Sequence, residues 1–217
     1  MNEYCTDRDL LGIEPIVFLD GGFPCQELAG GQGGELSGTT FQAAAGGFIS
    51  AGIKAGMVLC TYKTTPAEGS AWEIVGVLSP TQLSVSVLRA DVDGPVAPPK
   101  AGSDLLYHVR TYACQFANVS AALGEKLRQI FEVAGVAPAD YGQSVQLRLA
   151  AAYGALAEIF VARADNAEAY DANWLKAQHY RQLSREAQMR LRLVSDDDGD
   201  GRAERTRSLG NVALKRS

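Results

Sequence analysis

Apolar side chains recur every three or four residues in the second half of the chain, which is the spacing of one face of an α-helix. A first stripe covers residues 116–134, a second covers 145–160, and a third begins near 171 and continues to 194. Gly135 directly follows the first stripe, and glycine commonly terminates helices. The pattern predicts three amphipathic helices, and the short connections between them favour antiparallel packing.

The first hundred residues follow a different period. Leucine and valine alternate with serine over residues 83–87, which is the period of two that β-strands show. A second alternating run covers 72–78, and a Ser-Pro-Thr turn separates the two runs, so we predict a hairpin over 71–89. Further strands are expected at 57–62 and 39–44.

Glycine and proline divide this strand-rich part of the chain. The segment 13–104 is too short for a seven-stranded sandwich, so a small barrel-like sheet is the expected arrangement. Within it, the glycine-rich stretch 30–34 is expected to be a flexible, exposed loop, and 93–102 is expected to be a linker. Residues 105–112 are predicted to be a strand or an extended approach to the first long helix.

Together these patterns predict an α+β protein. Thr6 can cap a short helix that ends at Gly12, so residues 1–12 join 105–194 in a helical bundle of about four helices. The β-barrel-like module at 13–104 is expected to be an insertion into that bundle. Residues 195–217 are expected to form an extended C-terminal arm.

The charge is distributed unevenly along the chain. Residues 1–175 hold 10 Lys or Arg against 19 Asp or Glu, whereas residues 176–217 hold 10 against 6. The basic end is either a solvated tail or an arm that binds an acidic partner, including the acidic half of another copy. The chain as a whole is net acidic and has no basic stripe with interleaved aromatic residues, so sequence-specific nucleic-acid binding is not expected.

The four cysteines are predicted to be free thiols. Cys5, Cys25, Cys60 and Cys114 are far apart in sequence and form no Cys-x-x-Cys pair, which argues against a zinc site or a disulfide framework. We expect no signal peptide, because the chain opens with an acidic segment, and no membrane partner, because no apolar run approaches ~18 residues. Production in a cytoplasm is therefore expected.

No catalytic signature stands out, so the chain is predicted not to be an enzyme and to need no cofactor. His108 and His179 are the only histidines, and structural roles are expected for both. The acidic turn Asp196-x-Asp198-x-Asp200-Gly201 matches the first half of a calcium loop. Arg207 stands where the closing bidentate acid should be, which favours a solvated, helix-breaking turn but leaves cation binding open.

Several segments resemble phage head-to-tail adaptor proteins. The opening Tyr4-Cys5-Thr6-Asp7-Arg8-Asp9-Leu10 is similar to the start of that group, and the run 174–181 resembles its last long helix. The acidic turn and the following Arg207-Ser208-Leu209 resemble its terminal arm. The run 37–59 and the hairpin at 71–89 look like a small β-module found in phage virion proteins.

The resemblance implies a virion structural protein that is assembled in the host cytoplasm. Such adaptors form a ring, commonly of twelve copies, beneath the portal protein and join it to the tail or its stopper. A binding module is the alternative, in which the β-insertion recognises a glycan or another virion protein. Under the first interpretation the arm contacts the portal or a neighbouring copy through Arg202, Arg205, Arg207, Leu209, Leu214, Lys215 and Arg216. The interface helix contributes Trp174, Tyr180, Arg181 and Arg185. If this helix buries Trp174, then Leu175 and Met189 face elsewhere, and that residual apolar surface favours oligomerisation.

Overall fold

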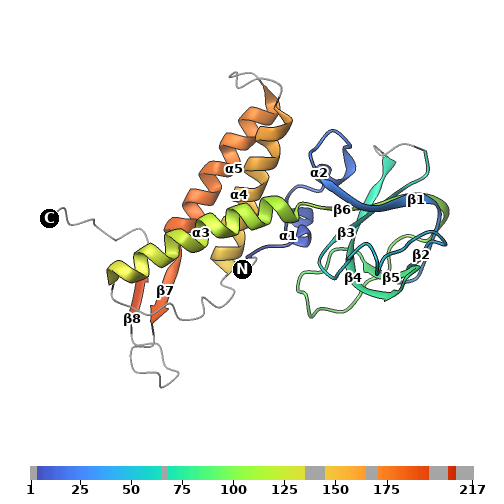
Figure 1. Cartoon of the computed structure of the whole chain (residues 1–217), viewed down its shortest axis with the longest axis horizontal. Helices are drawn as coiled ribbons and strands as arrows, with labels where there is room; N and C mark the ends of the chain where they lie inside the picture. Colours follow the sequence, from blue (N-terminus) through green and yellow to red (C-terminus); the bar gives the residue numbers. More distant parts are fainter. Residues whose placement is uncertain (1–3, 65–67, 135–144, 165–170, 196–204, 209–217) are drawn as a thin grey trace. The chain divides into compact units, whose positions relative to one another are not determined.

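The computed structural model describes residues 4–64, 68–134, 145–164, 171–195 and 205–208. These residues form two compact units (Figure 1). The barrel unit consists of Thr6–Ala113, and the helical unit consists of Met1–Cys5 together with Cys114–Ser217.

A closed antiparallel barrel of six strands dominates the barrel unit. The strands follow the order β1-β2-β5-β4-β3-β6, and β6 pairs back with β1. Because every strand has two neighbours, the sheet has no open edge at which another chain can pair. The strands are β1 (Gln26–Ser37), β2 (Thr40–Gln42), β3 (Val58–Tyr62), β4 (Ser70–Ser79), β5 (Gln82–Ser86) and β6 (Gly102–Thr111).

The predicted hairpin is confirmed, since β4 and β5 pair as antiparallel neighbours across the Ser-Pro-Thr turn. The expectation of a helical bundle with an inserted module is wrong. Residues 102–111 form the strand β6, which pairs with both β1 and β3 and so closes the barrel. A strand that completes the sheet on both sides belongs to the fold of the barrel rather than to a connection into a bundle.

The glycine-rich stretch at 30–34 is a strand and not the loop that the sequence suggested, although residues 30–33 are exposed as expected. It lies within the 12-residue strand β1 and is paired with β6. A Cβ atom on Gly31 would lie 3.1 Å from the Tyr107 ring, and one on Gly34 would lie 2.7 Å from the Phe41 ring. The glycines therefore leave room for aromatic side chains that fill the barrel, which explains a strand with little β-propensity.

Aromatic rings fill the inside of the barrel. Phe41, Phe48 and Tyr107 are fully buried, and the Phe41 and Tyr107 ring centroids lie 5.1 Å apart with their edges meeting faces. Such edge-to-face pairs add to the free energy gained from burying the rings. The aliphatic residues around them are Leu36, Leu59, Ile74, Leu83, Val85, Leu105 and Val109.

The hydroxyl of Tyr107 has no hydrogen-bond partner within the part of the chain that is described. A buried polar group without a partner costs roughly 1–3 kcal/mol of stability. We therefore expect Tyr107→Phe to leave the free energy of unfolding unchanged or to raise it by up to about 1 kcal/mol. Urea denaturation of the two proteins measures this difference. A loss above ~1 kcal/mol would show that the hydroxyl makes a bond that stabilises the fold.

Two short helices, α1 (Asp7–Ile13) and α2 (Ile16–Leu19), cover part of the outer face of the barrel. The Tyr112 hydroxyl donates to the Val17 carbonyl at 2.6 Å, and the Asp7 carboxylate accepts from the Tyr112 backbone N–H at 2.8 Å. The Phe18 and Tyr112 rings pack edge to face at 5.3 Å. These contacts hold α1 on the barrel, whereas the sequence analysis assigned it to the helical bundle.

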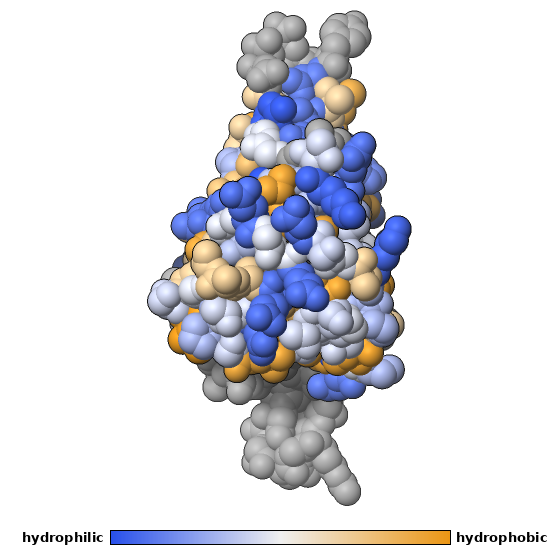
Figure 2. Space-filling model, turned by 90° about the vertical axis from the view of Figure 1, so that its right-hand side faces the viewer, coloured by the Kyte–Doolittle hydropathy of each residue, from blue (hydrophilic) through white to orange (hydrophobic). Residues whose placement is uncertain are grey.

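The outer surface of the barrel unit is mixed. Figure 2 shows apolar residues in separate patches among polar ones on one face of this unit. Ile49 and Leu78 are the most exposed of the large apolar residues described in the barrel unit, at 59% and 58%.

The helical unit contains α3 (Ala113–Ala134), α4 (Val145–Arg163) and α5 (Ala172–Met189), with the strands β7 (Arg192–Ser195) and β8 (Arg205–Ser208). The helix α4 packs along α5. A Cβ atom on Gly154 of α4 would lie 2.8 Å from the Val119 side chain of α3, so this glycine allows the two helices to approach closely.

The helix α4 is apolar enough and long enough to cross a membrane by length and composition alone, but half of that window is buried inside the structure. Ala151, Leu156, Ile159 and Phe160 are among its buried residues. The core helix of a folded unit has the same composition, so the burial accounts for the hydropathy of α4.

Candidate functional site

The helix α5 begins at a strong cap and packs one face against α4. The Asp171 carboxylate accepts hydrogen bonds from the backbone N–H groups of Asn173 at 2.8 Å and Trp174 at 3.0 Å. Side chains on one face of α5 then pack against α4. The Tyr180 ring stacks on the Phe160 ring of α4, with the ring centroids 5.7 Å apart. The Ser184 hydroxyl donates to the Ala150 carbonyl on α4 at 2.8 Å. Asp171 satisfies backbone donors that the first turn leaves unpaired, so the start of α5 is fixed.

The four residues expected on an interface helix lie in different environments. Tyr180 is 7% exposed and is a core residue between α4 and α5. The Arg181 guanidinium lies 5.5 Å from the centre of the half-buried Trp174 ring, in a cation–π contact. Arg185 is exposed.

Two apolar side chains of α5 point away from the core. Leu175 is 53% exposed and Met189 is 56% exposed, in agreement with the expectation that they face away from the side of the helix that carries the half-buried Trp174. A polar helix that exposes large apolar side chains at both ends offers contacts to a partner. The sequence analysis found this signal as residues left outside the buried stripe.

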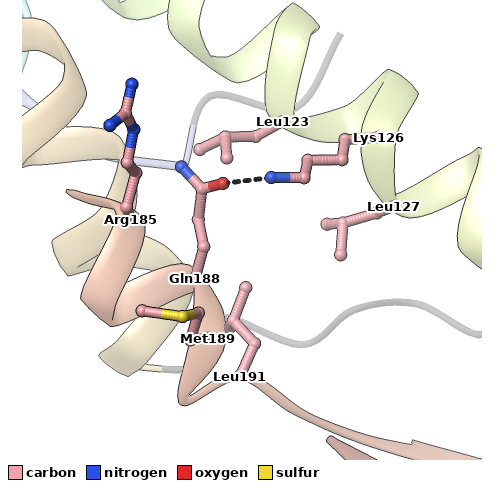
Figure 3. A pocket seen from close by; sticks show the side chains of 7 residues that line it. All are labelled: Leu123, Lys126, Leu127, Arg185, Gln188, Met189 and Leu191. Carbon is pink, nitrogen blue, oxygen red and sulfur yellow. Dashed lines mark hydrogen bonds between the residues drawn. The ribbon is translucent and has the colours of Figure 1, made fainter. Parts of the chain in front are cut away.

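A pocket of about 380 Å³ lies between α3 and the end of α5 (Figure 3). Leu123 and Leu127 enter it from α3, and Leu191 enters it from beyond α5. These three side chains are almost fully buried, so the pocket has an apolar floor. A volume of this size lies in the range of pockets that hold small ligands or single side chains.

Cations stand at the rim of this pocket. Lys126 and Arg185 are exposed, and the Lys126 ammonium donates a hydrogen bond to the Gln188 side-chain oxygen at 2.6 Å. Neither cation forms an ion pair with another residue in the described ranges. An apolar floor below two cations fits an apolar group that is flanked by carboxylates. The leucines of α3 belong to the stripe seen in the sequence, but only the packing of α5 against them produces a pocket.

The prediction that the last helix continues to Val194 is wrong. The helix α5 ends at Met189, and β7 then pairs with β8 in the register Leu193 with Arg207 and Ser195 with Arg205. Two of the predicted arm residues, Arg205 and Arg207, therefore lie on a strand. The acidic turn at 196–201 and the arm residues Arg202, Leu209, Leu214, Lys215 and Arg216 lie outside the described residues.

A second candidate is a polar cluster on the outside of the barrel, where His108 of β6 lies between Glu27 and Tyr62. Its Nδ1 lies 2.7 Å from a Glu27 carboxylate oxygen, and its Nε2 contacts the Tyr62 hydroxyl. A Cβ atom on Gly30 would lie 2.5 Å from the Glu27 carboxylate, so the glycine makes room for this pair. The cluster joins the neighbouring strands β1, β6 and β3.

The chemistry of this cluster favours a structural role. Burial raises the pKa of the Tyr62 hydroxyl, so the phenol stays protonated near neutral pH and is a poor nucleophile. Burial also raises the pKa of the nearby Cys60 thiol, to about 12, and that thiol donates to the Phe18 carbonyl at 3.3 Å. Thiols with raised pKa values are poor nucleophiles. The sequence analysis had predicted a structural role for His108, but the partners Glu27 and Tyr62 are distant in sequence and were missed.

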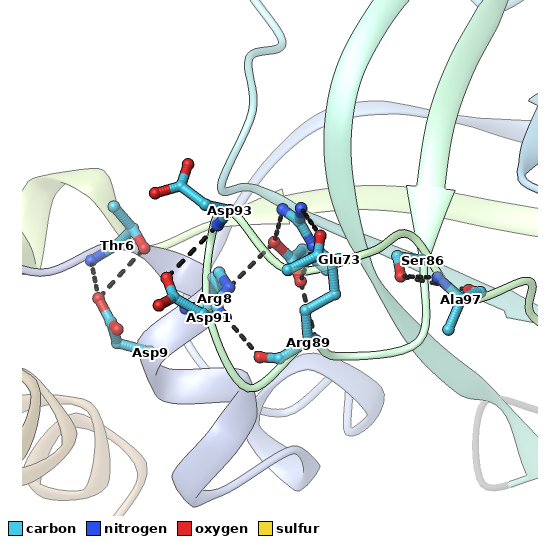
Figure 4. Close-up of polar contacts among 10 residues, drawn as sticks. Thr6, Arg8, Asp9, Glu73, Ser86, Arg89, Asp91, Asp93 and Ala97 are labelled. Carbon is cyan, nitrogen blue, oxygen red and sulfur yellow. Dashed lines mark hydrogen bonds and ion pairs between the residues drawn. The ribbon is translucent and has the colours of Figure 1, made fainter.

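A third polar feature is the carboxylate of Glu73, which is 1% exposed and lies between two arginines (Figure 4). The Arg8 Nε atom lies 2.9 Å from it and an Arg89 guanidinium nitrogen lies 2.7 Å from it. Burial acts to raise the pKa of Glu73, but hydrogen bonds from Arg89 and the charge of Arg8 outweigh it and lower the pKa overall. The network ties α1 and the segment after β5 to strand β4.

Among the residues that the structure describes, no three His, Cys, Asp or Glu side chains come together as a metal site would require. Comparison of the chain with protein-family models, with curated proteins and with solved structures gave no match.

Proposed function

We propose that this chain is a virion structural protein, a ring-forming head-to-tail adaptor that joins the portal of a tailed phage to its tail or stopper. The observation that carries the assembly part of the proposal is the basic, apolar-floored pocket of the helical unit beside the exposed Met189. The portal and tail as partners are supported by the sequence resemblance alone.

The charges of the two units support contacts between copies. The barrel unit contains six Lys or Arg and eleven Asp or Glu, a net charge of −5, whereas the rest of the chain contains fourteen of each. The whole net charge of the protein thus belongs to the barrel unit. The rest of the chain is neutral overall, but it places the cations Lys126 and Arg185 at the rim of the pocket. An acidic unit and a locally basic pocket favour contacts that join unlike surfaces of neighbouring copies.

Association can be measured directly on the full chain. We expect light scattering after size exclusion to show a mass that rises with concentration, or a discrete ring when the portal protein of the same phage is added. Leu175→Glu with Met189→Glu should prevent this, because two charges replace exposed apolar contacts. Ile49→Glu, at an equally exposed site on the barrel, is the matched control. A monomer under both conditions, with and without portal, would overturn the proposal.

A binding role for the barrel is the second candidate, and the exposed Ile49 and Leu78 are the observation that favours it. Exposed aliphatic side chains suit a protein partner better than a glycan, because sugars are bound through polar groups and aromatic rings. In the experiment above, loss of portal binding in Ile49→Glu but not in the α5 variant would favour this candidate.

A further inference from the structure

The segment between β5 and β6 exposes an acidic and apolar turn. Asp91, Val92 and Asp93 are all exposed, with Val92 at 51%. The turn therefore presents one aliphatic side chain flanked by two carboxylates to solvent.

The turn is held in one shape by its own hydrogen bonds, which Figure 4 shows in part. The Arg89 guanidinium donates to the Gly94 carbonyl at 3.0 Å, and the Gly94 backbone N–H donates to the Asp91 carbonyl at 3.1 Å. Arg89 is itself anchored on the buried Glu73. A turn that is already ordered loses little conformational entropy when it binds, which favours a role in recognition.

The pocket between α3 and α5 has the complementary chemistry. Its floor is apolar, and its two rim cations, Lys126 and Arg185, are exposed. Val92 can supply the apolar group, and Asp91 and Asp93 can supply the two carboxylates.

We propose that the turn Asp91-Val92-Asp93 of one copy docks in the α3–α5 pocket of the next copy. Val92 enters the apolar floor, and the two aspartates pair with Lys126 and Arg185. The inference rests on the proposed function, since it names the contact by which copies associate. A contact between two unlike surfaces repeats around a ring when its rotation closes.

Charge reversal tests the pairing. Variant A carries Asp91→Lys and Asp93→Lys, and variant B carries Lys126→Glu and Arg185→Glu. Each variant alone brings like charges together, so its self-association should fall roughly tenfold or more. In a mixture in which A and B alternate, the positive turn of A meets the negative pocket of B, and the negative turn of B meets the positive pocket of A. Opposite charges are then restored at every contact. The variant with all four changes should associate as the unchanged protein does.

Cysteine pairing tests the geometry independently of ring formation. In a Cys114→Ser background, copies with Val92→Cys are mixed with copies with Met189→Cys, and mixed disulfide dimers are counted under mild oxidation. We expect a yield at least roughly tenfold above that of Ile49→Cys mixed with Met189→Cys, and a loss of that excess when variant B's changes are added.

The outcomes separate the two proposals. Rings that form normally in variants A and B, with no excess of the Val92–Met189 dimer, would overturn this contact while leaving the adaptor proposal intact. A specific dimer without any ring would support the contact and count against the ring.

Discussion

Glu73→Gln is expected to destabilise the barrel unit by about 3–5 kcal/mol, because it leaves two nearly buried arginines without their anion. Glu73 binds Arg8 of α1 and Arg89 of the segment after β5, so both attachments to β4 weaken together. Trp72 in the barrel unit and Trp174 in the helical unit are the only tryptophans of the chain. In a Trp174→Phe background, Trp72 fluorescence therefore reports unfolding of the barrel unit alone.

Glu35→Gln is the matched control, since Glu35 is exposed on β1 and its neutralisation should change stability by less than ~0.5 kcal/mol. Equal effects of the two substitutions would show that the Glu73 network contributes no more than a surface charge.

The same network predicts how stability depends on pH. The folded-state pKa of Glu73 lies below its unfolded value, so its contribution is fully present above about pH 4.3 and is lost as the pH falls through the lower folded pKa. The difference in the free energy of unfolding between the unchanged protein and Glu73→Gln should therefore be constant near neutral pH and become smaller below about pH 4. Denaturant titrations from pH 7 to pH 3 measure this. A difference in the free energy of unfolding that stays constant from pH 7 to pH 3 would contradict a stabilising contribution from the ionised Glu73.

Gly34→Ala is expected to destabilise the barrel by about 1–3 kcal/mol through overpacking. The new Cβ atom would lie 2.7 Å from the Phe41 ring, and that ring is fully buried against Phe48 and Tyr107. The ring therefore has no free space into which it can move. Trp72 fluorescence during urea denaturation again reports the change.

Gly76→Ala provides the control for this prediction. Gly76 also lies in a strand, β4, but no atom lies within 4 Å of the Cβ position. Its replacement should be neutral or stabilise the protein by up to about 1 kcal/mol, because alanine restricts the unfolded chain. Phe41→Leu should lower the stability of the barrel by itself. It should nevertheless reduce the further loss of stability that Gly34→Ala causes. Similar effects of the two glycine substitutions would show that the aromatic packing of the barrel is looser than described.

Periodicity predicted the local elements of this protein well where one face of each element is buried. The hairpin at 71–89 and the start of the last helix near 171 follow from alternation and from the helical spacing of apolar residues. Periodicity gave the wrong structure at 30–34, because glycine has no side chain to show a period. It also extended the last helix to 194, because apolar residues at 191 and 194 continue the helical spacing while β7 already pairs with β8.

The candidate site was predicted only in part. Exposure of Leu175 and Met189 was deduced from their places outside the buried stripe of α5. The pocket was not predicted, because Leu123 and Arg185 are brought together only by the packing of α3 beside α5. The turn at 91–93 was not recognised as a unit, and only Asp93 fell in the predicted linker at 93–102, since the shape of the turn depends on the distant Glu73.

The sequence by itself determined the type and approximate position of most helices and strands, because these depend on side-chain spacing over a few residues. It also determined the separation of acidic and basic charge along the chain. The sequence predicted a small barrel-like sheet, but only the tertiary structure decided which strands close it, since closure depends on β6 pairing with β1 and with β3 across long stretches of chain. It likewise decided that glycines in β1 face aromatic rings, because that requirement arises from strand pairing: Gly31 lies opposite Tyr107, which is more than seventy positions away, and Gly34 lies against Phe41 of the next strand.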